Sequence, residues 1–260
     1  MSSEQFSRFE HPDVAEKCLN NLRLMNVGAG AGLRMMKLVS VFINWILIIE
    51  PDKIGMSDWR SGYPIEFSGE PKGIVAARIL TQMNPDLTVK IDQFYVNKTN
   101  RQRFKQASER CNLALVNIDD PEGIEVISEE LHQEMPIVSV HMTHGGRIGQ
   151  VVFTLPGKTP CLRCSLGPIE QLRGGRADPI RFDLTCAVAM KVIWELVRLA
   201  YGSRDDTEDI HIVRKGDAAL RNVLLVSCGE RDLVFGSLPP DHVMAVQSVL
   251  VQKSCSICRS

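Results

Sequence analysis

Two pairs of cysteines have the spacing of metal ligands. Cys161 and Cys164 form one C-x-x-C pair, and Cys255 and Cys258 form a second near the end of the sequence. This spacing lets two thiolates and the nearby amides close on one ion, and two such pairs complete a four-cysteine tetrahedral zinc site. A redox dithiol or separate structural thiols are the alternatives. Four thiolates leave no coordination position open, so the predicted Zn²⁺ would be structural.

A glycine-rich turn followed by acids is the second set of residues suited to chemistry. Residues 28–32 read Gly-Ala-Gly-Ala-Gly, and Glu50 and Asp52 follow the apolar residues 46–49. Glycine permits positive φ and lets bare amides approach a phosphate at a helix start, while a carboxylate after the second strand can bind ribose hydroxyls. The usual fingerprint is G-x-G-x-x-G, whereas Gly32 comes one residue early. A turn that merely packs a helix onto a sheet is therefore the alternative.

An alternation of strands and helices is predicted to position these residues. Residues 22–27, the glycine turn, an apolar helix and the strand 46–49 have the layout of a βαβ unit. Further helices are expected at 9–21, 71–80, 97–110 and 122–134, and further strands at 87–91, 113–118 and 137–141. This pattern predicts an α/β fold with a Rossmann-like, mostly parallel sheet flanked by helices and functional residues at the carboxyl ends of the strands.

The regular alternation of predicted strands and helices ends around Gly145-Gly146. Residues 148–155 read as a β-hairpin strand, and Asp183 is expected to cap a long helix that runs to about Ala200. Strands are expected at 211–213, 222–227, 232–236 and 246–251. We therefore expect a nucleotide-binding region at 1–144 and a β-rich C-terminal region at 145–260 that carries the zinc site, packed together as one compact domain.

Composition excludes some classes of partner. The chain has 260 residues, with 30 basic and 31 acidic side chains and a formal charge of −1, so nothing favours nucleic acid or a membrane surface as a partner. The N-terminus lacks the apolar core of a secretory signal, and the longest apolar stretch, residues 33–49, is shorter than a membrane span. Eight cysteines without an export signal favour reduced thiols. We expect a soluble cytoplasmic protein.

The order of these features resembles the ubiquitin-activating-enzyme-like superfamily of ThiF/MoeB-type adenylyltransferases. The matching features are the glycine turn, the acid-x-acid pair, a long loop, a Pro-Lys helix ending at Asn84-Pro85, a later acid and the two C-x-x-C pairs, over roughly residues 6–258. Members use Mg-ATP to activate the C-terminal carboxylate of a carrier protein as an acyl adenylate. The resemblance implies ATP, Mg²⁺ and Zn²⁺ as cofactors. It also implies a homodimer acting on a ubiquitin-like or sulfur-carrier protein with a C-terminal glycine, or on a peptide.

The resemblance also assigns roles to individual residues. Lys72 would compensate phosphate charge, Asp120 would hold Mg²⁺, and Arg8 in Phe6-Ser7-Arg8 would reach the phosphates of the partner subunit. The phosphate-facing turn and the acid pair that binds ribose would be formed by Gly28, Gly30, Gly32, Glu50 and Asp52. The simpler alternatives are a solvated lysine at 72, a helix cap at 120 and a surface arginine at 8.

The sequence departs from the family pattern in its arginines and its cysteine. The family's Asn-x-x-Arg-Gln corresponds to residues 58–62, so the arginine is absent from its place, although Arg60 is adjacent, and Arg34 or Arg8 could substitute for it. Glu125 stands where a later arginine is expected. Residues 165–182 contain no cysteine; the nearest, Cys186, is either a nucleophile near a helix start or a buried small hydrophobe.

These departures keep two other classes of function open. A non-catalytic relative would keep the fold and bind a partner without turnover. An NAD(P)-dependent oxidoreductase would share residues 28–50, but it gives no role to Lys72, to Asp120 or to the cysteine pairs.

Overall fold

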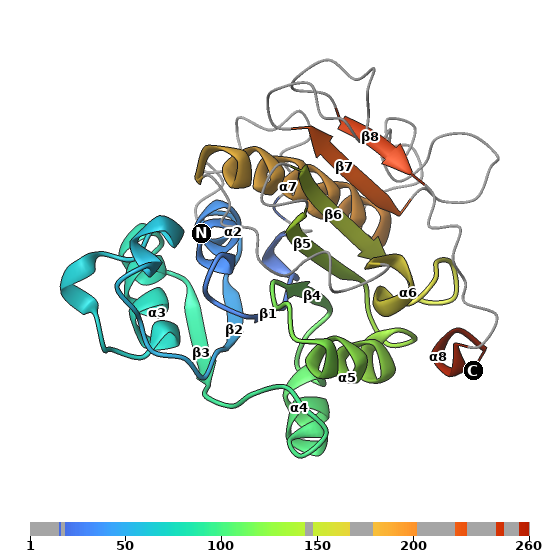
Figure 1. Cartoon of the computed structure of the whole chain (residues 1–260), viewed down its shortest axis with the longest axis horizontal. Coiled ribbons are helices and arrows are strands. Elements are labelled where there is room, and N and C mark those ends of the chain that lie inside the picture. The colour runs from blue at the N-terminus through green and yellow to red at the C-terminus, as the bar shows by residue number, and fades with distance from the viewer. Residues whose placement is uncertain are drawn as a thin grey trace.

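The computed structural model describes residues 16, 19–143, 148–166, 179–201, 222–227, 243–246 and 255–259, and within them a single eight-stranded sheet lies between helices (Figure 1). Its strand order is β3-β2-β1-β4-β5-β6-β7-β8. The strands are β1 (Leu24–Val27), β2 (Trp45–Ile49), β3 (Thr88–Asp92), β4 (Leu113–Val116), β5 (Ile137–Thr143), β6 (Ile148–Thr154), β7 (Val223–Ser227) and β8 (Val243–Val246). The first five in this order are mutually parallel, and β6, β7 and β8 continue the sheet antiparallel. The predicted Rossmann-like fold with a β-rich C-terminal part is confirmed.

Helices connect the parallel strands and cover both faces of the sheet. They are α2 (Gly32–Ser40), α3 (Lys72–Met83), α4 (Arg101–Ser108), α5 (Pro121–Leu131), α6 (Leu162–Leu166), α7 (Pro179–Tyr201) and α8 (Ser256–Arg259). The long loop after β2 contains two 3₁₀ turns, η2 (Asp58–Ser61) and η3 (Ile65–Phe67). Parallel strands need such crossovers, and the crossovers place every loop that follows a parallel strand at one edge of the sheet.

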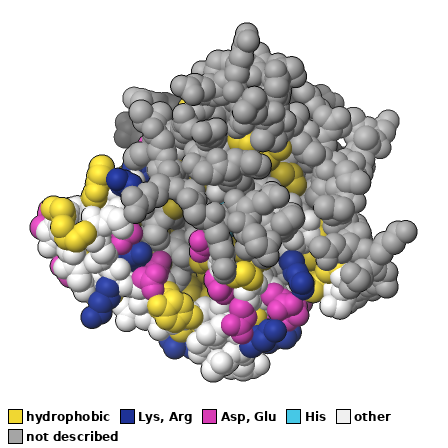
Figure 2. Space-filling view, viewed as in Figure 1, with side chains coloured by type: hydrophobic (Ala, Val, Ile, Leu, Met, Phe, Trp, Pro, Cys, Tyr) yellow, Lys and Arg dark blue, Asp and Glu magenta, His cyan; other side chains and the backbone are white. Residues whose placement is uncertain are grey.

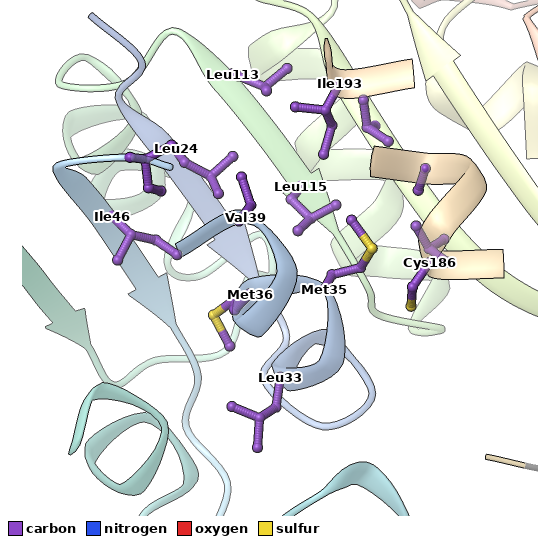
Figure 3. Packing of buried hydrophobic residues seen from close by; sticks show 14 of the residues in the cluster. Leu24, Leu33, Met35, Met36, Val39, Ile46, Leu113, Leu115, Cys186 and Ile193 are labelled. Carbon is purple, nitrogen blue, oxygen red and sulfur yellow. The ribbon is translucent and has the colours of Figure 1, made fainter. Parts of the chain in front are cut away.

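Two hydrophobic layers explain why the parallel strands read as continuous apolar runs. On one face, side chains of β1 and β2 pack against α2 and α7, as Leu33, Met35 and Ile193 show in Figure 3. On the other face, alternate residues of the same strands pack against Phe104 of α4 and Ile124 of α5. All four residues of β1 are buried, as expected for a strand covered on both sides.

Some predicted boundaries were wrong. Helix α7 begins at Pro179, so Asp183 lies inside the helix and does not cap it. Strand β8 ends at Val246, where the predicted strand begins. The predicted strands at 211–213 and 232–236, Arg8 and most of the predicted helix 9–21 lie outside the described residues. The division at residue 144 stays a prediction.

Candidate functional site

A pocket of about 370 Å³ opens at the carboxyl ends of β1, β2 and β4, where a parallel sheet is expected to bind its ligand. Six of the predicted site residues line it: Gly28, Gly30, Glu50, Asp52, Lys72 and Asp120. The other lining residues are Val27, Ile49, Pro51, Phe94, Tyr95, Val96, Asn97, Asn117, Ile118, Asp119 and Glu122. On the described part of the face shown in Figure 2, acidic and basic side chains lie together.

The three glycines of the turn serve different purposes. Gly28 has φ +89°, and a Cβ there would come within 2.9 Å of the Asn117 carbonyl oxygen. A Cβ on Gly32 would lie 2.9 Å from the side-chain nitrogen of the same asparagine. A Cβ on Gly30, by contrast, would meet nothing within 4 Å, and Gly30 lines the pocket. The backbone therefore requires glycine at 28, a side chain at 32 would displace the Asn117 side chain, and glycine at 30 leaves room for a ligand.

The start of α2 offers backbone donors to this space. Helix α2 begins at Gly32, and its N-cap residue, Ala31, makes no side-chain cap. The amides of Leu33 and Arg34 donate to the carbonyl oxygens of Gly30 (3.3 Å) and Ala31 (3.1 Å), so the helix dipole and the turn amides that precede them make this end attractive to anions. The turn can therefore bind phosphate oxygens.

Glu50 is held rigidly beside the turn. Its side chain is buried, and its two carboxylate oxygens accept hydrogen bonds from the amides of Ala29 (2.5 Å) and Asp52 (2.8 Å). Burial raises the pKa of Glu50 above its ordinary value, although both hydrogen bonds and the Lys72 charge act in the opposite direction. Each oxygen keeps a further lone pair, so Glu50 is a fixed acceptor suited to ribose hydroxyls.

Lys72 is a paired lysine at the start of α3. Its side chain is 13% exposed, and its Nζ lies 3.3 Å from Asp58 and 3.9 Å from Asp52. The alternative of a solvated helix residue is therefore wrong. Asp52 also accepts a hydrogen bond of 2.6 Å from the Tyr95 hydroxyl. Sequence reasoning missed Tyr95, although an aromatic residue shortly after the carboxyl end of a parallel strand was the available signal.

Asp120 caps a helix and also faces the pocket. One of its oxygens accepts a hydrogen bond of 2.7 Å from the Gly123 amide and caps α5, and the residue also lines the pocket. Asp119 and Glu122 line the pocket beside it. Carboxylate oxygens grouped in this way are the ligands that Mg²⁺ prefers.

The four paired cysteines meet in one cluster. Their sulfurs lie within 4.8 Å of one another, with distances of 3.8 Å between Cys161 and Cys255 and 3.7 Å between Cys164 and Cys258. A tetrahedral ion with Zn–S bonds of about 2.3 Å separates its sulfurs by about 3.8 Å, whereas a disulfide needs about 2.05 Å. The four cysteines are not joined in disulfides. The cluster can therefore hold a metal ion, as the spacing predicts.

Comparison with protein-family models matches residues 3–205 to the ThiF family. The chain belongs to the ThiF family. The resemblance seen in the sequence is thereby confirmed.

Several solved structures have the same fold as this chain. They include the microcin C7 biosynthetic enzyme MccB in complex with N-formylated MccA (TM-score 0.69, 14% identity, 95% of this chain and 70% of that chain), E. coli MccB with ATP (0.66, 16%, 96% and 70%) and selenomethionine PaaA (0.64, 12%, 92% and 77%). At these identities the likeness establishes the fold. A search of curated proteins gives no significant match.

Of the arginines considered as substitutes for the missing ThiF-family arginine, Arg34 and Arg60 are described, and neither lines the pocket. Arg34 donates to the carbonyl oxygen of Arg60 (2.6 and 3.1 Å) and to both carboxylate oxygens of Asp183 (2.6 Å each). Arg34 thus joins α2, the long loop and α7. The guanidinium of Arg60 lies over the Trp59 ring, 5.4 Å from its centroid, and Arg8 is outside the described residues.

Glu125 stands where the ThiF-family pattern has a later arginine, and its carboxylate links α5 to α6. It pairs with Arg163 of α6 at 2.9 Å and with Lys98 at 3.2 Å. The Arg163 amide also donates to the Ser128 hydroxyl at 3.1 Å. The first cysteine pair is thereby joined to α5, the helix that Asp120 caps.

Cys186 lies in the core. It is fully buried in α7 and packs in the same cluster as Met35 (Figure 3). Burial raises the pKa of its thiol well above the ordinary range. This environment favours a packed small hydrophobe over the predicted catalytic role, because a nucleophile needs an accessible thiolate.

In the described parts of the chain, no helix combines the length and the apolar character needed to cross a bilayer.

Proposed function

We propose that this ThiF-family protein is an ATP-dependent adenylyltransferase that activates the C-terminal carboxylate of a small ubiquitin-like or sulfur-carrier protein, or of a peptide. The observation that carries the proposal is the pocket, where the glycine turn, a fixed carboxylate, a lysine and further acids face one space. Similar structures described as MccB with ATP and with MccA support a nucleotide and a peptide as ligands.

The pocket residues fit Mg-ATP better than free ATP. Five carboxylates line the pocket, those of Glu50, Asp52, Asp119, Asp120 and Glu122, and Lys72 is the one lysine or arginine among the described lining residues. A polyphosphate therefore needs additional positive charge to bind there. Bound Mg²⁺ would supply this charge and neutralise phosphate oxygens. Asp120 and its acidic neighbours would hold the ion.

The chain's own groups would then orient the nucleotide. The amides at the start of α2 and the open space beside Gly30 suit the phosphates, and Glu50 suits the ribose hydroxyls. Lys72 would neutralise phosphate charge. Zn²⁺ in the cysteine cluster would have a structural role.

The reaction itself asks little of a general base. A carboxylate oxygen of the substrate attacks the α-phosphorus, an acyl–phosphate bond forms, and the bond to the bridging oxygen breaks as pyrophosphate leaves. The nucleophile is already ionised, so positioning and positive charge dominate catalysis. We propose that Arg60 and, in a homodimer, Arg8 of the second copy add to Lys72 in this role. For Arg60 this requires its guanidinium to leave Trp59.

The main alternative is a non-catalytic ThiF-family protein that binds its partner without turnover. The engagement of Arg34 by Asp183 and the placement of Glu125 favour it, because neither position then supplies a cation to the pocket. An NAD(P)-dependent oxidoreductase is the weaker alternative, because the acids beside Asp120 have no role in it. For any of these functions we expect a cytoplasmic protein.

ATP–pyrophosphate exchange tests the proposal. Exchange is measured with candidate carriers or peptides, each paired with the same molecule carrying an amidated C-terminus. We expect exchange with the free carboxylate and none with the amide. Binding of ATP without exchange for any candidate would support the non-catalytic alternative, and binding of NADH in place of ATP would support the oxidoreductase.

A further inference from the structure

The pairing of Lys72 with Asp58 has consequences for nucleotide binding. The two charged atoms are 3.3 Å apart, and the side chains are 13% and 16% exposed. Such a pair is shielded from water on most sides, so it is screened less than a surface ion pair. Lys72 lines the pocket, whereas Asp58 does not.

Asp58 is fixed in place by its own loop. The oxygen that faces Lys72 also accepts a hydrogen bond of 2.7 Å from the Gly55 amide. The Asp58 carbonyl accepts one of 3.3 Å from the Tyr63 amide. Tyr63 is buried, and its hydroxyl donates to the Ala29 carbonyl in the glycine turn at 2.8 Å. Because the loop is anchored to the turn, Asp58 cannot follow Lys72 toward a ligand without breaking these contacts.

The charges on the pocket wall make this restraint important. Lys72 is the one lysine or arginine among the described residues that line the pocket, against five carboxylates. Its single positive charge is shared with Asp58 and, at 3.9 Å, with Asp52. A phosphate that approaches Lys72 therefore competes with two carboxylates for the same ammonium group.

We propose that Asp58 is a positioning residue that draws the Lys72 ammonium away from bound phosphates and so makes nucleotide binding depend on divalent cations. The proposal rests on the proposed function and adds to it a reason why the nucleotide would bind only when a divalent cation is present. Asp58 acts through Lys72 and does not itself contact the nucleotide.

Replacing Asp58 by asparagine tests this mechanism. Asp58→Asn keeps the size and one acceptor oxygen but removes the charge. The double variant Asp58→Asn/Lys72→Met removes both charges, and Glu134→Gln removes one exposed charge in the turn after α5 as a matched control. Binding of ATP and of inorganic tripolyphosphate is measured by calorimetry, first with EDTA and then over a series of Mg²⁺ concentrations. Thermal midpoints are measured without ligand.

Two properties should change in opposite directions. In EDTA, we expect Asp58→Asn to bind both ATP and tripolyphosphate about tenfold more tightly than the wild type, the order expected for one partly shielded charge. The Mg²⁺ concentration needed for half-maximal ATP binding should fall. The thermal midpoint without ligand should also fall, because Lys72 loses a partner. The double variant should lose the gain in affinity, and Glu134→Gln should match the wild type.

Several results would overturn the proposal. Weaker or unchanged binding by Asp58→Asn in EDTA would mean that Asp58 does not restrain Lys72. Persistence of the gain in the double variant would mean that the effect does not pass through Lys72. If the wild type bound no ATP at any Mg²⁺ concentration, the proposed function would fail as well, whereas unchanged variants with a wild type that binds Mg-ATP would remove this inference alone.

Discussion

The pocket at the carboxyl ends of the strands and the cysteine cluster differ in how their ionisable groups are satisfied. In the cluster, sulfurs from segments 94 residues apart already lie at the separations of a tetrahedral ion. In the pocket, Lys72 is paired with acids, and the carboxylates outnumber it. The cluster is complete with one small ion. The pocket has an excess of negative charge, which a cation bound together with a larger ligand would compensate.

This difference predicts where stability and where binding should respond to mutation. A closed metal site links distant segments, so its loss should act mainly on folding. An open pocket keeps groups poised for a ligand, so its changes should act mainly on affinity. The following variants separate the two effects.

The largest effect is expected in the cluster. Cys258→Ser should reduce zinc from about one ion per chain to almost none and lower the thermal midpoint by roughly 10 °C or more, because the bound metal stabilises the folded state. Elemental analysis and calorimetry measure both. Cys111→Ser, outside the cluster, should keep the metal. Freshly reduced wild-type protein without zinc would refute this expectation.

Two substitutions in the glycine turn should separate an effect on stability from an effect on ligand binding. Gly28→Ala should lower the free energy of unfolding by about 1–3 kcal/mol, because its φ of +89° and the contact with Asn117 disfavour a side chain. Gly30→Ala should leave the thermal midpoint unchanged, since its Cβ meets no atom within 4 Å. It should weaken ATP binding by roughly tenfold by filling ligand space. Equal effects of the two variants on the thermal midpoint would contradict the geometry.

Smaller effects are expected at the link between the regions. The Ser128 hydroxyl is buried and joins the Arg163 amide to the Ile124 carbonyl. Ser128→Ala should lower the free energy of unfolding by about 1–2 kcal/mol, because a donor loses its partner. Arg163→Met, which removes an ion pair of a half-exposed arginine, should cost less than about 1 kcal/mol. Denaturant titration measures both, and the reverse order would show that the ion pair dominates.

The sequence predicts the parts of the site that are set by local order along the chain. Gly28 lies in the crossover after β1, and Glu50 and Lys72 lie in the crossover after β2, so a parallel sheet brings them to one edge. The helix start at Pro179 also had a local signal, because proline is favoured at the first helical position. The prediction that Asp183 caps this helix was therefore wrong.

Pairings between distant side chains could not be predicted in the same way. Asp183 binds Arg34, 149 residues away, and this removes the arginine from the set of cations that could act in the pocket. Asp58 reaches Lys72 because a buried tyrosine anchors the loop. Both pairings depend on how helices and loops pack together, and spacing along the chain carries no information about that packing.

Titration of Mg-ATP and, separately, of NADH into the wild type and Lys72→Met tests the central claim most directly. We expect the wild type to bind Mg-ATP and not NADH, and Lys72→Met to bind Mg-ATP roughly 100-fold more weakly, because a preorganised charge on phosphate is lost. Zinc content should stay the same in both proteins. Equal Mg-ATP affinities of the two proteins, or binding of NADH without binding of ATP, would contradict an ATP-binding pocket that depends on Lys72.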